Sequence, residues 1–324
     1  MRAIDVLRPG GSDQLVVSQV DLPVLRPGQV LIKVAACGVN RPDLLQRKGF
    51  YPPPAEADPR LGLEVSGKIV KLADDVNSSW LDQSVMALCN GGGYAEFVAV
   101  PVGQCMPIPP GVSLTDAASL PETYLTVWQN LFDSGQLASG MHVLIHGGSS
   151  GIGCAAIQLA AAHGAQVHVT VGSNEKATFC QSLGAHYVYN YQTQDWVTQV
   201  LHNVQSGVHL ILDMVAGAYI QRDLNCLAVQ GKIFIIALMG GRTIELDGAQ
   251  LLKKQGSLCA NTLRSQTLQY KAQLVKKVSA CLNNFFTQGL LKTTVTKRFN
   301  LIEVSLAHDL IESGRHMGKI VLEV

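Results

Sequence analysis

The most constraining feature of this chain is a glycine-rich run in its middle, His146-Gly147-Gly148-Ser149-Ser150-Gly151-Ile152-Gly153. Three apolar residues, 143–145, precede the run, and a helical pattern of small residues, 154–162, follows it. Glycines permit a tight bend and a close approach of backbone to a ligand, and the N–H groups at a helix start attract an anion. This order of strand, turn and helix predicts a site for the pyrophosphate of a dinucleotide, with Gly148, Gly151 and Ile152 as contacts.

Composition excludes several classes of protein. The 324 residues are enough for two domains, and 47% of them are hydrophobic against 15% charged. A net charge of +1 gives no reason to expect a nucleic-acid or anionic membrane partner. No apolar run approaches the length of a membrane helix, and the N-terminus does not resemble a signal peptide. Eight cysteines without a CxxC pair indicate reduced thiols and predict a cytoplasmic protein.

The secondary-structure pattern changes along the chain. Short strands predicted at 30–34, 65–72, 84–88 and 94–100, separated by Gly and Pro turns, are typical of a small barrel or sandwich. A helix is predicted to open at 115–118 with Thr115 as its cap. Strands and helices then alternate, which predicts a doubly wound parallel sheet: strands at 166–171, 187–189, 210–213, 232–238 and 257–261, and helices at 175–183, 196–204 and 219–227. A helix at 267–287 precedes a last strand at 318–322, which we expect to rejoin the first domain.

The end of the predicted strand 166–171 bears on the choice of cofactor. NAD sites usually carry Asp or Glu there to bind the ribose hydroxyls, whereas this chain continues Gly172-Ser173. The missing carboxylate permits a 2′-phosphate, Ser173 can cap the next helix and donate to phosphate, and Lys176 offers a cation. These features favour NADPH over NADH, although Lys176 alone is equally consistent with a solvated helix lysine.

Several ordered segments resemble one known family: residues 38–49, 51–54, 61–67, 121–128, the glycine turn, 238–241, 263–265 and 318–321. The chain is similar to the medium-chain dehydrogenase/reductase superfamily, in its zinc-free quinone oxidoreductase branch and especially the p53-inducible quinone oxidoreductase type. The resemblance implies a GroES-like β-rich catalytic domain at 1–118 and 265–324. It also implies a Rossmann domain at 119–264 and a homodimer.

The resemblance also bears on metal content. Zinc members of the superfamily hold their catalytic metal with a cysteine and a histidine, at positions where this chain has Asn40 and Leu63. Neither residue is a normal zinc ligand, and no histidine occurs before His142. We therefore expect no metal. Without a Lewis acid, hydride donation to an activated acceptor such as a quinone or an α,β-unsaturated carbonyl is favoured over alcohol oxidation.

Site residues are carried over from the resemblance position by position. It implies that Asn40 and Asp43 lie beside the nicotinamide, although Asp43 is more simply explained as a residue that fixes its loop. Tyr51 either donates a hydrogen bond to the acceptor or packs on the prolines that follow it. Ten further residues match family positions around the cofactor: Thr126, Gly172, Ser173, Lys176, Tyr191, Met239, Gly240, Gly241, Arg264 and Lys319. Arg264 and Lys319 are equally consistent with surface cations, and Met239 is also consistent with a packing role.

We predict an NADPH-dependent, zinc-independent quinone reductase. The glycine turn also resembles that of short-chain dehydrogenases, but no tyrosine here has a lysine four positions on. An NADPH-dependent 2-enal or enoyl reductase uses the same fold and stays open. A non-catalytic NADPH-binding protein, crystallin-like or RNA-binding, is the alternative of another class, disfavoured by the absence of a basic stripe.

Overall fold

The computed structural model describes residues 1–324, which form two compact units. The first unit comprises Met1–Leu125 and Arg264–Val324, and the second comprises Thr126–Leu263. The passage between them falls within helix α3 (Pro121–Val127). The domain limits expected after residues 118 and 264 stay a prediction. Each unit is described by itself below.

The second unit is built on a parallel sheet of six strands in the order β10-β9-β8-β11-β12-β13. The strands are β8 (His142–Ile145), β9 (Gln166–Val171), β10 (Tyr187–Asn190), β11 (Val208–Asp213), β12 (Leu227–Ile235) and β13 (Ser257–Ala260). The strand order reverses next to β8, which the glycine run follows. Ligands of open parallel sheets bind at such a reversal. The predicted doubly wound sheet is confirmed.

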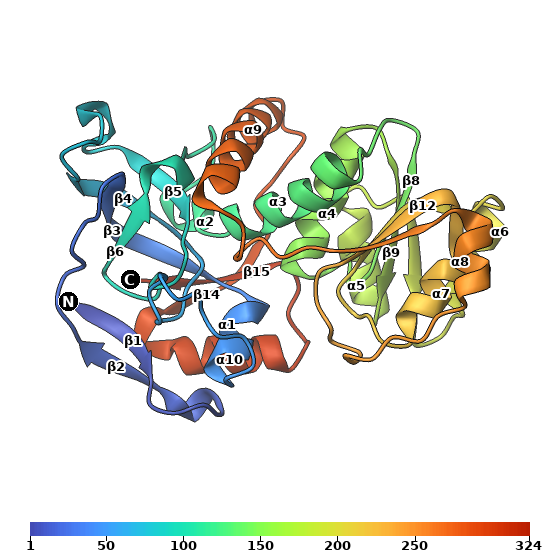
Figure 1. Ribbon diagram of the computed structural model, residues 1–324, viewed down its shortest axis with the longest axis horizontal. Helices are drawn as coiled ribbons and strands as arrows, with labels where there is room; N and C mark the ends of the chain where they lie inside the picture. The colour runs from blue at the N-terminus through green and yellow to red at the C-terminus, as the bar shows by residue number, and fades with distance from the viewer. The chain divides into compact units, whose positions relative to one another are not determined.

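Helices pack on the strands of this sheet (Figure 1). α4 (Gly151–Ala162) contacts β8 and β9, and α5 (Asn174–Gln181) contacts β9 and β10. α6 (Trp196–Asn203), α7 (Tyr219–Cys226) and α8 (Gly248–Lys254) share one apolar core with the strands. The fully buried Trp196 is the largest side chain in that core. Because α4 is rich in alanine and glycine, its axis can lie close to the sheet.

The first unit is mainly antiparallel. β1 (Arg2–Val6) and β2 (Leu15–Gln19) form a hairpin. A larger sheet has the order β14-β15-β3-β4-β5-β7, and β6 also pairs with β3. Its strands are β3 (Gln29–Val39), β4 (Glu64–Leu72), β5 (Ser84–Leu88), β6 (Phe97–Pro101), β7 (Cys105–Pro107), β14 (Val295–Asn300) and β15 (Lys319–Glu323). β15 pairs antiparallel with β3, which confirms that the last strand rejoins this domain.

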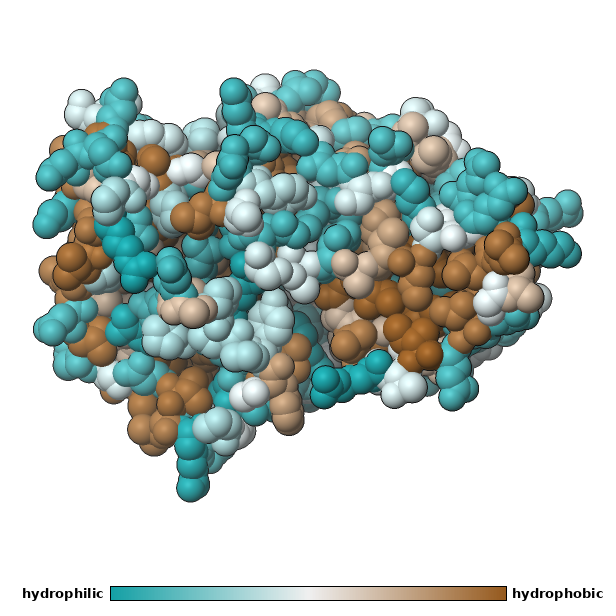
Figure 2. Space-filling view, viewed as in Figure 1, coloured by the Kyte–Doolittle hydropathy of each residue, from teal (hydrophilic) through white to brown (hydrophobic).

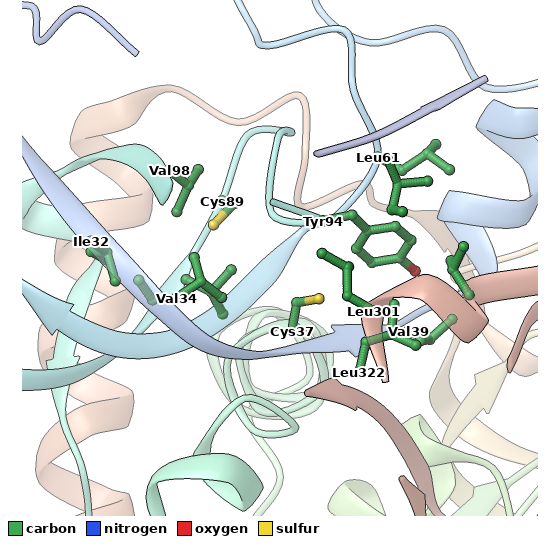
Figure 3. Packing of buried hydrophobic residues seen from close by; sticks show 14 of the residues in the cluster. Ile32, Val34, Cys37, Val39, Leu61, Cys89, Tyr94, Val98, Leu301 and Leu322 are labelled. Atoms are coloured by element: carbon green, nitrogen blue, oxygen red, sulfur yellow. The ribbon is translucent and has the colours of Figure 1, made fainter. Parts of the chain in front are cut away.

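Alternating residues of β3 and its neighbours fill the core of the first unit, where Figure 3 shows Ile32, Val34 and Tyr94 among the packed side chains. Four helices complete the unit: α1 (Arg41–Arg47), α2 (Leu114–Ala117), α9 (Leu268–Thr287) and α10 (Val304–Glu312). α9 is amphipathic and turns Leu274, Val278 and Leu282 inward.

Several details differ from the sequence-based expectations, among them the following. β12 begins at Leu227, not at Lys232, because the chain passes through Gly231 without turning, and the ladder with β11 shifts register instead. Ser113, not Thr115, caps α2, since its Oγ accepts the N–H of Asp116 at 3.1 Å. The hairpin β1–β2 and helix α10 were not predicted, because both are short elements that depend on contacts distant in sequence.

No helix is both long and apolar enough to cross a membrane. All eight cysteines carry free thiols, and six of them are buried. Figure 2 shows apolar side chains gathered on the viewed face of the second unit. Exposed apolar residues of that unit include Leu238, Met239 and Leu252.

A buried histidine makes the first unit sensitive to acid. His308 of α10 accepts a hydrogen bond from Arg47 at its Nδ1 (3.1 Å), and its Nε2 lies 3.3 Å from the Tyr94 hydroxyl. Burial and, to a smaller extent, the charge of Arg47 lower the pKa of His308 to about 3. The unfolded chain therefore takes up this proton first, near pH 6.5, and stability is lost as pH falls from 6.5 towards 3.

We predict that this one histidine accounts for about 2 kcal/mol of the unfolding free energy lost between pH 7 and pH 5. His308→Gln should reduce the loss between those pH values by that amount, measured by urea unfolding at both. His202→Gln, at an exposed position of α6, is the control and should leave the loss unchanged. An equal loss in His308→Gln and wild type would contradict the prediction.

Candidate functional site

The glycine run forms a tight turn between β8 and α4. Gly147 has a φ of +64°, which favours glycine, and Gly148 donates its N–H to the Thr170 carbonyl at 3.0 Å. Ser150 caps α4, because its Oγ accepts the N–H of Gly153 at 3.0 Å. Gly151 and Ile152 are the first two residues of α4, whose N–H groups have no acceptor within the helix. The predicted contacts Gly148, Gly151 and Ile152 thus lie together at a helix start suited to an anion.

More predicted cofactor residues follow the carboxyl end of β9. Gly172 packs against Tyr191 so closely that a Cβ there would lie 2.5 Å from the tyrosine oxygen. Ser173 caps α5 by accepting the N–H of Lys176 at 3.2 Å. Tyr191 follows β10 and is 42% exposed. Because β8, β9 and β10 are parallel neighbours, these residues share one edge of the sheet with the glycine turn.

The loop after β12 completes this edge. Gly240 donates its N–H to the Val215 carbonyl at 2.6 Å, and a Cβ on Gly217 would meet the Gly240 carbonyl oxygen at 2.6 Å. Met239 in the same loop is 56% exposed, so it is not a core residue. Gly241 follows with a φ of +135°. Thr126 lies apart in α3, where its carbonyl accepts the Asn130 amide at 2.9 Å.

A buried lysine is the centre of the polar cluster in the first unit. The Lys319 Nζ lies 2.6 Å from Glu64 Oε1, 2.7 Å from Asn40 Oδ1 and 3.2 Å from the Val39 carbonyl oxygen. Asn40 also donates its amide to Glu64 Oε1 at 2.8 Å. Lys319 is 4% exposed and Glu64 is fully buried. All three ammonium protons of Lys319 have protein acceptors, so the surface-cation interpretation of this residue is wrong.

Asp43 lies beside this cluster and fixes the loop that carries Asn40. Its carboxylate accepts the N–H of Asn40 at 2.9 Å, the N–H of Gly62 at 3.0 Å and the Tyr94 hydroxyl at 3.1 Å. Burial raises the pKa of Asp43 to about 6, against the lowering effect of these hydrogen bonds. The Tyr94 hydroxyl donates to Asp43 and therefore accepts from His308, which joins α1 and α10 in one network.

A second polar group contains Tyr51, Arg264 and Lys271. The Arg264 guanidinium lies 5.5 Å from the centre of the Tyr51 ring and donates from Nη1 to Gln46 Oε1 at 2.7 Å. Arg264 is 7% exposed, so it is not a surface cation, and its buried Nε has no hydrogen-bond partner. Lys271 donates to Asn90 Oδ1 at 2.7 Å and to the Arg264 carbonyl at 2.8 Å. Burial lowers the pKa of Lys271 to about 8.

The predicted residues therefore divide between the two units. Asn40, Asp43, Tyr51, Arg264 and Lys319 belong to the first unit. The second unit holds the residues around the parallel sheet: Thr126, Gly148, Gly151, Ile152, Gly172, Ser173, Lys176, Tyr191, Met239, Gly240 and Gly241. Their roles in binding and catalysis stay predictions.

The cluster around Lys319 does not suit zinc. The ammonium group occupies the space between Glu64 and Asn40, where it would repel a metal cation. Three other potential ligands, His146, Asp213 and Asp223, lie together in the second unit. His146 Nε2 is 2.7 Å from Asp223 Oδ1, and Asp213 accepts the N–H groups of Val215 and Ala216. These contacts engage His146 Nε2, Asp223 Oδ1 and both carboxylate oxygens of Asp213, whereas the buried Asp223 Oδ2 has no hydrogen-bond partner.

Two functional candidates were missed in the sequence. Lys271 interrupts the buried face of α9, since it stands three and seven positions before Leu274 and Val278. That break in the apolar pattern was a readable signal. Glu122 directly follows Pro121, and its backbone N–H donates to Glu64 Oε2 at 2.9 Å. Nothing in the local sequence distinguishes it from an ordinary helix-start glutamate.

Two family patterns match parts of the chain. The family pattern "Alcohol dehydrogenase GroES-like domain" matches residues 26–110, and "Zinc-binding dehydrogenase" matches residues 151–280. A quinone oxidoreductase of Rattus norvegicus is 31% identical over 99% of this chain and 97% of its own length. The chain belongs to the quinone oxidoreductase branch of the medium-chain dehydrogenase/reductase family.

Solved structures of this family have the same fold. A mycobacterial protein solved as its NADPH complex superposes with a TM-score of 0.90 at 26% identity, over the whole of both chains. The CurK enoyl reductase superposes with a TM-score of 0.87 at 27% identity, over 99% of this chain and 98% of its own. The predicted combination of a Rossmann sheet and a GroES-like domain is confirmed.

Proposed function

We propose that this protein is an NADPH-dependent quinone reductase that works without zinc. The observation that carries the proposal is the Lys319–Glu64–Asn40 cluster, because an ammonium group stands where a metal-dependent alcohol dehydrogenase needs a Lewis acid. Bound NADPH supplies a hydride. An acceptor that delocalises the arriving charge, such as a quinone, has the least need of a metal. The 31% identical rat quinone oxidoreductase supports this acceptor class.

The proposed NADPH site consists of residues at the carboxyl edge of the parallel sheet. The N–H groups at the start of α4 would hold the pyrophosphate. Ser173, Lys176 and Tyr191 would surround the 2′-phosphate, and Gly172 allows Tyr191 to approach. β9 ends without a carboxylate that would repel this phosphate. The mycobacterial NADPH complex of the same fold supports the assignment.

Lys176→Ala is expected to weaken NADPH binding about 10-fold while leaving NADH binding unchanged, because only NADPH carries the phosphate that the ammonium group would neutralise. Dissociation constants measured by calorimetry for both cofactors check the prediction. Lys253→Ala, at an exposed position of the same unit, is the matched control. A similar loss for both cofactors would place Lys176 outside the phosphate pocket.

The function itself is tested by NADPH oxidation with chelator-treated protein against ortho-quinones, para-quinones and 2-enals. Turnover with quinones that survives chelation is the expected result. The CurK neighbour makes an enoyl reductase the second candidate, and turnover with 2-enals alone would establish that reading. Binding of NADPH without any turnover would contradict both.

Two finer proposals concern the assembly and the compartment. The edge strand β13 has a partner on one side only, and a second copy can pair with such an edge, which supports the homodimer expected from the resemblance. Light scattering tests it, and a monomer would contradict it. Eight unpaired thiols support a reducing compartment such as the cytoplasm.

A further inference from the structure

The reduction of a quinone by a hydride also requires a proton, and neither Lys319 nor Asp43 is free to supply it. The two-electron reaction is quinone plus NADPH plus H⁺ to hydroquinone plus NADP⁺. The ammonium protons of Lys319 are all held by protein acceptors. Asp43 accepts three hydrogen bonds from protein groups. A proton donor must therefore lie elsewhere.

Glu122 is the carboxyl group of the first unit that remains uncommitted near these residues. Its backbone is fixed, since its N–H donates to Glu64 Oε2 at 2.9 Å, whereas its side-chain carboxyl takes part in no hydrogen bond or ion pair with the protein. The residue as a whole is half-buried. Helix α3 therefore fixes the position of Glu122, and no neighbouring residue engages its carboxyl group.

The groups that interact electrostatically with Glu122 come from six other parts of the first unit. Loss of hydration raises the pKa of Glu122 to about 8. The charges of Glu64 in β4 and Asp43 in α1 contribute to this rise of the pKa, and those of Lys319 in β15 and Lys271 in α9 oppose it. Tyr51 and Arg264 also interact electrostatically with Glu122. At neutral pH the carboxyl is therefore mainly protonated, which is the form that an acid catalyst needs.

Neighbouring donors indicate where an acceptor oxygen would bind. The Arg264 Nε–H is buried and has no acceptor in the protein, although the guanidinium is otherwise fixed by Gln46. The same guanidinium lies over the ring of Tyr51, 5.5 Å from the ring centre, and the Tyr51 hydroxyl donates to no protein group. An unpartnered buried donor costs free energy unless a ligand satisfies it. A carbonyl oxygen at Arg264 and Tyr51 would satisfy that donor, and both residues interact electrostatically with Glu122.

We propose that Glu122 is the proton donor of the reaction and that Arg264 and Tyr51 hold the acceptor oxygen beside it. This inference rests on the proposed function. The hydride that bound NADPH would supply carries two electrons and would form one O–H bond of the hydroquinone. The Glu122 O–H bond would break, and its proton would form the other O–H bond. Solvent then returns a proton to the Glu122 carboxylate. Atoms and charges balance, and no further oxidant or reductant is needed.

The test compares wild type with Glu122→Gln, which keeps the shape of the side chain and removes its acidic proton. The kcat/KM of the wild type for a para-quinone is expected to fall as pH rises through about 8. In Glu122→Gln, kcat/KM at pH 7 should be about 100-fold lower and this pH dependence should disappear. Glu122→Asp, which restores an acid, should recover part of the activity. The exposed Glu56→Gln is the matched control and should behave as wild type.

Two further measurements separate acid catalysis from a structural role. A tetrahalogenated para-quinone has a more acidic hydroquinone and needs less protonation, so Glu122→Gln should lose less activity with it. The infrared spectrum at pH 7 should contain a protonated carboxyl band that Glu122→Gln lacks, whether or not substrate is present. An equal loss with both quinones, or the absence of that band, would overturn the proposal.

Lys271 requires its own control, because its pKa also lies near 8. If the pH dependence disappears in Lys271→Met and persists in Glu122→Gln, Glu122 is not the donor. Quinone reduction by the wild type with an unchanged pH dependence in Glu122→Gln would overturn this inference alone. A wild type that binds NADPH and reduces no quinone would overturn the proposed function, and the donor role with it.

Discussion

Replacing Lys319 with methionine is expected to lower the free energy of unfolding by about 3–5 kcal/mol. The reason is the charge left behind, not the loss of the lysine alone. Glu64 is fully buried and its Oε1 lies 2.6 Å from the ammonium group. Without that partner, an ionised carboxylate stays in the interior with only the Asn40 amide and the Glu122 N–H to compensate it. Thermal and urea unfolding of the purified variant measure the effect.

Two further variants test whether the effect comes from the unpaired buried charge. Lys33→Met removes an exposed lysine from β3 of the same sheet and should change the unfolding free energy by less than about 1 kcal/mol. The double variant Lys319→Met/Glu64→Gln removes both charges, so it should be more stable than Lys319→Met alone. If Lys319→Met and Lys33→Met cost the same, the buried pair contributes nothing and the interpretation of the cluster fails.

The second large effect is expected at Gly153, where an added methyl group cannot be accommodated. A Cβ there would lie 2.4 Å from the carbonyl oxygens of both Gly147 and Gly148. These atoms belong to the backbone of the turn, so relief requires α4 and the turn to move apart. Such strain costs about 1–3 kcal/mol, which would weaken a cofactor held by the turn about 10- to 100-fold.

Calorimetric titration of Gly153→Ala with NADPH measures this loss directly. Gly248→Ala is the matched control, because Gly248 begins α8 of the same unit and nothing lies within 4 Å of its added Cβ. Alanine also favours a helix, so the control should be as stable as wild type or slightly more stable. NADPH binding by Gly153→Ala at wild-type affinity would show that the turn does not hold the pyrophosphate.

Local sequence patterns were sufficient to predict the fold of the second unit, because its strands, turns and helices are each specified by residues close together in the chain. A strand, a glycine turn and an alanine-rich helix predict one βα unit, and alternation predicts the parallel sheet. The cofactor residues could be located for the same reason, since Gly148, Gly172 and Gly240 each follow a strand. The carboxyl ends of parallel strands meet at one edge, so chain position alone brings these residues together.

The polar clusters of the first unit depend on contacts between distant segments. Lys319 meets Glu64 across 255 positions and Asn40 across 279. No local pattern predicts such a meeting, because it depends on the antiparallel register of β15 on β3. The same applies to the contact of Arg264 with Gln46 and to the environment of Glu122.

The sequence by itself determined the fold class, the glycine turn and the absence of an acid at the end of β9, since propensities and turn chemistry act between near neighbours. Only the tertiary structure decided which charges are buried and with what partners. The tertiary structure shows that Lys319 is buried at the centre of a polar cluster, with all of its ammonium protons hydrogen-bonded. It also distinguishes Glu122 from the other glutamates. The physical reason is that burial and neighbouring charges act on a titratable group through space. Strand pairing decides which residues, distant in sequence, lie close enough to affect one another.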